Sequence, residues 1–171
     1  MSCSQTLTAI AKDCNANIGG VKRVYVANAD DVTAVTVTSG KITGITMASG
    51  KKFLEFAFRA NTASMTSTWQ VSAETGAKYV QTLLAMQFSR METSKRLAIQ
   101  ALALADAVAI VEDMNGAFWY LGYEFPLELN AGDGGTGTQR TDRNGYGITL
   151  EDDCTELPLE VDDSIISGIT S

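Results

Sequence analysis

The stretch AVAIVEDMNGAFWYLGY, residues 107–123, decides the fold. Its first six residues, Ala107 to Glu112, form an almost continuous apolar run, which suits a central strand buried on both faces of a sheet. The pair Asn115-Gly116 follows, and Asn-Gly between two strand-like runs indicates a β-hairpin, because both residues tolerate the positive φ of a type I′ turn. The aromatic segment Ala117 to Tyr123 is then the partner strand. The sequence therefore predicts a β-sheet with this hairpin inside it.

Other short runs of β-branched or alternating apolar residues are separated by turn residues, which is typical of strands. The further ranges that we expect as strands are Val21–Ala27, Val32–Thr38, Ile42–Met47, Lys52–Arg59, Thr68–Ser72 and Tyr146–Leu150. Residues 78–88 fit two periods, because Val80, Leu84 and Phe88 share a strand face but also have helical spacing. We interpret this segment as a strand and keep a helix as the alternative.

Residues 93–105, TSKRLAIQALALA, form the clearest helical segment. Thr93 or Ser94 can cap the free amides of the first turn, and strong helix formers follow. Leu97, Ala101 and Leu104 lie on one wide apolar stripe, so the helix is expected to pack into the core.

These elements predict a mainly β fold, a β-sandwich or partly closed barrel with one flanking α-helix at about residues 93–105. The expected organisation is an N-terminal arm at residues 1–18, a single domain at 19–160 and a C-terminal tail at 161–171. The glycine-rich segment 130–138 is expected to be a flexible loop.

Composition and charge exclude several functional classes. The 171 residues carry a net charge of −7, which disfavours simple DNA binding because the chain as a whole repels phosphate. No apolar run is long enough for a membrane span, no signal peptide is expected, and we expect no membrane partner. The three cysteines suggest reduced structural thiols. Residues 1–105 contain 11 Lys and Arg against 6 Asp and Glu, whereas residues 106–171 contain 2 against 14. Such an asymmetry could be accidental, or it could guide head-to-tail stacking of copies.

Residues for catalysis or cofactor binding are not evident. The chain has no histidine, which removes the commonest general base and transition-metal ligand. The segment Gly132 to Gly137 lacks the Lys-Ser/Thr of a phosphate loop, and the two fragments Asp113–Gly116 and Asp142–Gly145 lack the bidentate Glu of a calcium loop. We therefore nominate no catalytic, cofactor-binding or metal-binding residue, and we expect that the protein is not an enzyme. The aromatic residues Phe118, Trp119 and Tyr120 could line a ligand groove, but core or interface packing is favoured.

The C-terminal half resembles the tail tube (major tail) proteins of phages that infect Bacteroidetes. The resemblance covers about residues 78–160: the helix TSKRLAIQALALA, the hairpin AVAIVEDMNGAFWYLGYEFPLEL, the glycine-rich loop, and the run from Asp142 to Leu150 that leads into Glu156-Leu157-Pro158. It implies a β-sandwich with one flanking helix that assembles into hexameric rings, which stack into a hollow conduit for DNA.

The resemblance also implies partners and a location. The partners would be copies of the chain itself, other tail and neck proteins of the virion, and DNA in transient, non-specific passage. The protein would belong to the virion tail and would be assembled in the host cytoplasm. The residues that we expect at a subunit interface are Trp69, Val71, Tyr79, Asp152, Asp153 and Glu156. Two alternatives stay open: another virion ring component, such as a neck, head-completion or tail-terminator subunit, and a monomeric β-barrel binding module.

Overall fold

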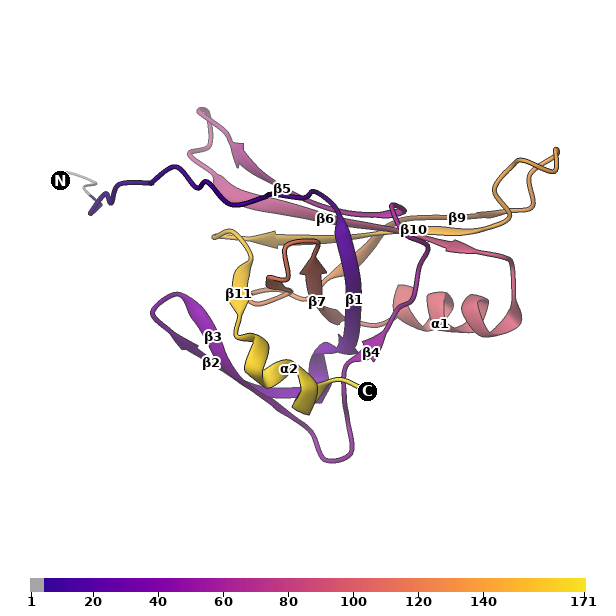
Figure 1. Cartoon of the computed structure of the whole chain (residues 1–171), viewed down its shortest axis with the longest axis horizontal. Helices are drawn as coiled ribbons and strands as arrows, with labels where there is room; N and C mark the ends of the chain where they lie inside the picture. Colours follow the sequence, from indigo (N-terminus) through magenta and orange to yellow (C-terminus); the bar gives the residue numbers. More distant parts are fainter. Residues whose placement is uncertain (1–4) are drawn as a thin grey trace.

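The computed structural model describes residues 5–171 and is mainly β, with two sheets in layers and two α-helices beside them (Figure 1). The strand order is β2-β3-β11-β8-β7-β1-β4 in the seven-stranded sheet and β5-β6-β10-β9 in the four-stranded sheet. Neither sheet closes on itself. The predicted β-sandwich with a flanking helix is therefore confirmed.

The seven-stranded sheet is antiparallel except where β11 runs parallel to β3. Its strands are β1 (Val21–Asn28), β2 (Val32–Thr38), β3 (Lys41–Met47), β4 (Leu54–Glu55), β7 (Ala107–Asp113), β8 (Phe118–Leu121) and β11 (Leu159–Val161). A short 3-10 turn, η1 (Ala29–Asp31), joins β1 to β2. As predicted, β7 is buried on both faces: Ala109 and Val111 face one core, and Val108 and Ile110 face a second.

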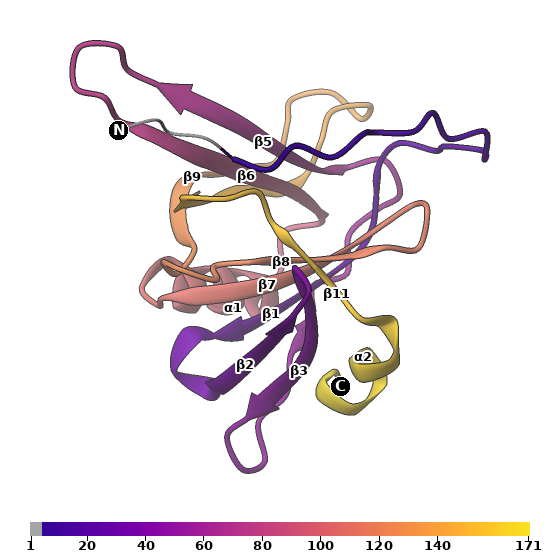
Figure 2. The same ribbon diagram turned by 90° about the vertical axis from the view of Figure 1, so that its left-hand side faces the viewer.

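The four-stranded sheet is antiparallel throughout and lies as a separate layer over the other (Figure 2). Its strands are β5 (Ala63–Val71), β6 (Lys78–Ser89), β9 (Glu128–Gly135) and β10 (Gly145–Cys154). The ambiguous segment 78–88 is thus a strand. Its inward residues Leu84 and Met86 pack with Ile148 and Leu150 of β10 against the inner side of the other sheet.

The predicted hairpin at Asn115-Gly116 is present between β7 and β8, but the turn is not of type I′. Only Gly116 has positive φ, at 86°. The Asp113 carboxylate accepts the N–H groups of Asn115 and Ala117 at 2.8 and 3.0 Å, and the Asp113 N–H donates to the Ala117 carbonyl. These bonds close a loop in which a single residue needs the left-handed conformation.

Helix α1 (Thr93–Ala103) is present where it was predicted, but its packing differs. It lies at one end of the sandwich, with Leu102 buried and Ile99 half-buried. Leu97 and Leu104 are 53% and 86% exposed. The expectation that the Leu97 stripe packs into the core is therefore wrong, because only the adjacent face of the helix reaches the sheets.

The segment treated as a C-terminal tail contains a second helix, α2 (Asp163–Ile169), which the sequence did not predict. Asp162 caps it by accepting the Ser164 N–H. Ile166 and Ile169 are buried against the second core, where Phe53 is fully enclosed. A seven-residue helix has too few turns for its period to stand out in a sequence.

Two further expectations differ from the structure. The range Lys52–Arg59 gives only the short strand β4, because Phe53 turns into the second core while Phe56 and Phe58 pack against the first. Residues 130–135 of the expected loop belong to strand β9 instead. Gly134 suits this strand because a Cβ there would lie 2.9 Å from the Tyr146 ring, which would have to shift.

Candidate assembly surfaces

The four-stranded sheet has two free edges. Strand β5 forms one edge and β9 the other, and within residues 5–171 each pairs with a single neighbour, β6 or β10. Four of the eight residues of β9 are glycine or alanine, so little side-chain bulk shields its backbone. A free edge presents a row of N–H and C=O groups that can pair with a strand of another chain.

The outward face of this sheet is acidic. The register places Glu128, Asp133, Glu151 and Asp153 on the side away from the core. The outward positions of the four strands contain no lysine or arginine. Arg143, in the loop before β10, pairs with Asp133 and offsets one of the four charges. No helix or strand of the described chain covers this face (Figure 1).

A chain of hydrogen bonds crosses all four strands on the outward face. Gln70 of β5 donates to Gln81 of β6 at 3.2 Å, and Gln81 donates to the Glu151 carboxylate of β10 at 2.5 Å. Asn130 of β9 donates to the second oxygen of Glu151. Sequence reasoning missed this row because its members are far apart in the chain and only the strand register aligns them.

Three of the residues predicted at an interface lie near the tip of the β5–β6 hairpin. Trp69, Val71 and Tyr79 are 53%, 65% and 38% exposed. Strand β10 ends at Cys154, which pairs with Val80, so β6 continues past β10 toward the tip. Trp69 and Val71 are on the core-facing side of the sheet by register, but here no other layer lies against them to bury them.

The three predicted acidic residues lie in different environments. Asp152 is buried, and its carboxylate accepts the Gly122 N–H and the Cys154 thiol, both at 2.7 Å. It therefore holds the two sheets together and is not available to a second copy. Asp153 lies on the outward face, where partial burial and then the neighbouring Glu151 and Asp152 charges raise its pKa. Glu156 is exposed in the connection between β10 and β11.

The aromatic residues considered for a ligand groove are engaged in packing. Tyr120 is buried in the second core, and burial raises its pKa well above the ordinary value. The Trp119 indole N–H donates to Asp113 at 3.0 Å, and Phe118 is half-buried beside the second core.

The charge asymmetry along the sequence is partly neutralised inside the chain. The buried Glu112 carboxylate accepts a hydrogen bond from the Lys22 ammonium at 2.6 Å, and its other oxygen lies 3.7 Å from the Arg23 Nε. Lys41 of β3 pairs with Glu160 of β11 at 3.0 Å. Three basic side chains from residues 1–105 thus have acidic partners from residues 106–171 in the same molecule. Fewer charges are therefore left for contacts between copies.

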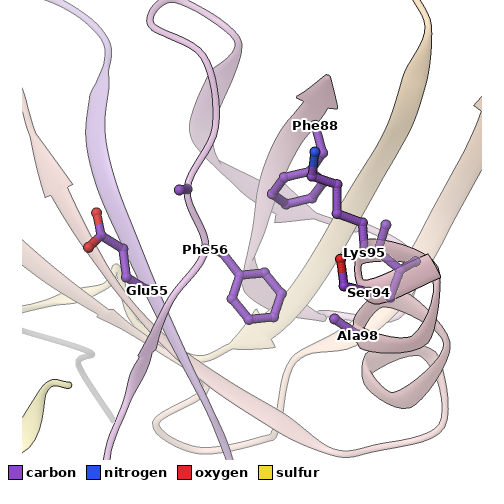
Figure 3. A pocket seen from close by; sticks show the side chains of 8 residues that line it. Glu55, Phe56, Phe88, Ser94, Lys95 and Ala98 are labelled. Atoms are coloured by element: carbon purple, nitrogen blue, oxygen red, sulfur yellow. The ribbon is translucent and has the colours of Figure 1, made fainter. Parts of the chain in front are cut away.

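An apolar cleft of about 300 Å³ lies beside α1 (Figure 3). Phe56 and Phe88 form its floor in an edge-to-face pair with ring centroids 6.1 Å apart. Ala98 and Ile99 of α1 form one wall, and the Lys95 ammonium is held at the rim by the Ser89 carbonyl at 2.6 Å. The sequence offers no signal for this cleft, since its aromatic residues come from distant segments.

Within residues 5–171, no three His, Cys, Asp or Glu side chains gather as a metal site would require. None of the helices in that range is long and apolar enough to cross a membrane. No protein-family model, curated protein or solved structure matches the chain.

Proposed function

We propose that the protein is a virion structural subunit that assembles into stacked rings and forms the tail tube through which DNA passes. The observation that carries the proposal is the four-stranded sheet, which combines two free edges with an uncovered acidic face. The resemblance of residues 78–160 to tail tube proteins supports the same assignment and implies a hexameric ring.

The strand directions suit a closed ring. Four antiparallel strands leave β5 and β9 running in opposite directions. A copy related by rotation about an axis along the strands therefore brings its β5 antiparallel to the β9 of its neighbour. The two edges match in length, with nine residues in β5 and eight in β9. Repeating this junction closes a barrel and removes both free edges.

In such a barrel the outward face of the sheet lines the channel. Its glycine, threonine and glutamine residues are neutral, and its charged groups are mostly carboxylates. Carboxylates repel the phosphates of DNA, so the DNA slides without being held. The function needs no cofactor and no catalytic residue. The partners are other copies and the adjoining tail and neck proteins, in the virion and during assembly in the host cytoplasm.

Electron microscopy of the purified full chain tests this function. Hollow tubes of stacked rings support it. Single rings that do not stack indicate a neck, head-completion or terminator component instead. A strict monomer at high protein concentration contradicts ring assembly and supports the binding module.

The channel assignment has its own test. Adding positive charge to the outward face, by Glu128→Lys with Thr149→Lys, should leave tube assembly intact. The variant tubes should bind added DNA and protect it from nuclease digestion. The exchange Asp30→Lys, in the other layer, is the control and should retain none. If both variants behave like the parent protein, the acidic face does not line the channel.

A further inference from the structure

The two ends of the four-stranded sheet carry opposite charge. We call the residues around the β5–β6 tip and the end of β10, 72–79 and 153–156, the hairpin end. We call residues 90–96 and 140–143, which lie beyond the other end of the strands, the helix end. The hairpin end contains Glu74, Asp153 and Glu156 against Lys78. The helix end contains five bases, Arg90, Lys95, Arg96, Arg140 and Arg143, against two acids, Glu92 and Asp142. It stays basic when Asp133 of β9, which pairs with Arg143, is counted as a third acid.

Exposed apolar groups also lie beside both ends. Beside the hairpin end, Val71 and Tyr79 lie past the last residue of β10 and Trp69 lies level with it. All three are exposed, Tyr79 on the outward face and the other two on the opposite face. The cleft over Phe56 and Phe88 lies beside the helix end (Figure 3). Leu97, the next residue of α1, is exposed. Burying the apolar side chains of the hairpin would stabilise a contact by removing their surface from water.

The two surfaces lie at opposite ends of the same strand. Strand β6 runs from Lys78 in the hairpin end to Ser89, four residues before α1. Its 12 residues span about 40 Å at the usual rise per residue. In Figure 1 the β5–β6 tip and α1 correspondingly lie on opposite sides of the molecule. A second copy displaced along the strands brings an acidic end against a basic one.

We propose that the hairpin end of one copy docks on the helix end of the next copy along the tube. This axial contact rests on the proposed function, because it joins successive rings. It is heterologous, with different surfaces on the two partners, so it leaves one free end of each kind and can repeat without limit. Opposite charge fixes the polarity, since two hairpin ends or two helix ends repel each other.

A competing occupant of the helix end is the extended arm at residues 5–18, where Leu7 and Ile10 are exposed. In this range Lys12 and Asp13 cancel, so the arm offers no net charge to the basic end. The acidic hairpin is therefore the better complement.

Charge reversal tests the contact, starting from conditions in which the parent protein forms tubes. In this contact we place Glu74 of the hairpin opposite Arg96 of α1. Glu74→Lys and Arg96→Glu should each weaken stacking about tenfold or more, because like charges then face each other at this pair, and should leave single rings. Asp30→Lys and Lys52→Glu, on the other layer, are matched controls and should give tubes of parent length. The double variant E74K/R96E restores opposite charges and should form tubes again.

A mixture of the two single variants provides a second readout. Rings of one variant can then stack only on rings of the other, so tubes should appear on mixing. Their appearance also proves that both variants are folded. Parent-length tubes from either single variant alone, or rings that stay unstacked in the double variant, overturn the axial contact. Failure of the parent protein itself to form rings and tubes refutes the proposed function instead. If deleting residues 5–16 abolishes stacking while charge reversal does not, the arm occupies the helix end and the proposal is wrong.

Discussion

Ending the chain after Asp162 would remove helix α2 and open the second core. Ile166 and Ile169 are buried, and burial of an aliphatic side chain contributes about 1.5–3 kcal/mol. Two hydrogen bonds would also go: the Phe53 N–H donates to the Ile169 carbonyl at 2.8 Å, and the Ser171 N–H donates to the Phe53 carbonyl at 3.0 Å. Each contributes about 0.5–1.5 kcal/mol. The summed loss is about 4–9 kcal/mol, against a total stability of about 5–15 kcal/mol for a typical domain.

Urea unfolding at low protein concentration measures this loss without assembly. The truncated chain should be largely unfolded or should unfold at a much lower urea concentration. The point variant Ile169→Ala should lose about 2–5 kcal/mol, which lowers the midpoint by roughly 1–2 M. Ser167→Ala on the exposed side of α2 is the control and should change stability by less than about 0.5 kcal/mol. If the truncated chain has the same midpoint and slope as the full chain, residues 163–171 are a dispensable tail and our account of the second core fails.

Three further outcomes test the packing of single groups. Gly145→Ala should prevent normal folding, because the added Cβ would lie 1.9 Å from the Phe88 carbonyl oxygen. Gly168→Ala has open space around it in α2 and should stabilise the fold by about 0.5–1 kcal/mol, as measured in thermal melts. In a variant whose other cysteines are serine, Cys154 should react with a thiol reagent at pH 8 only after unfolding, since burial raises the pKa of its thiol to about 11; rapid reaction in the native state would contradict this. Hydrogen bonds from the Ser164 hydroxyl and N–H lower the pKa of Asp162. Its ionised carboxylate therefore stabilises the folded state above the ordinary pKa of 3.8, and this stabilisation is lost as the pH falls through the lower folded-state pKa. Asp162→Asn should therefore destabilise the protein at pH 7 and progressively less in acid, as unfolding titrations across that range would show.

The features that the sequence predicted are those with a strong local pattern. Strand β7 was evident because five consecutive residues, Ala107 to Val111, face the two cores alternately, which makes that run continuously apolar. Helix α1 was evident from propensity, but its exposed Leu97 stripe was not, since the same apolar period describes a core helix and an interface helix. Strand β9 was missed because its glycines, which suit an edge beside Tyr146, are also the residues of loops.

The candidate surfaces were predictable only in part. Trp69, Val71 and Tyr79 are exposed on the hairpin, in keeping with the sequence prediction, although their role in assembly stays a prediction. The free edges and the row from Gln70 to Asn130 depend on which strands become neighbours, and no local pattern encodes that order. The axial charge difference also needed the fold, because it follows the two ends of a sheet and not the two halves of the chain.

The acidic run Glu151-Asp152-Asp153 illustrates how one strand separates surface from core. Alternation along β10 places Glu151 and Asp153 outward and Asp152 inward, level with Thr82 of β6. The inward carboxylate is tolerated because it accepts the Gly122 N–H from the end of β8 and the Cys154 thiol. A slip of one residue would bring the two outward acids into the core and leave the Gly122 N–H without its acceptor. The same three residues therefore fix the register of the sheet and keep its outward face acidic, so a substitution that relaxes the register would also alter the surface that we propose for the channel.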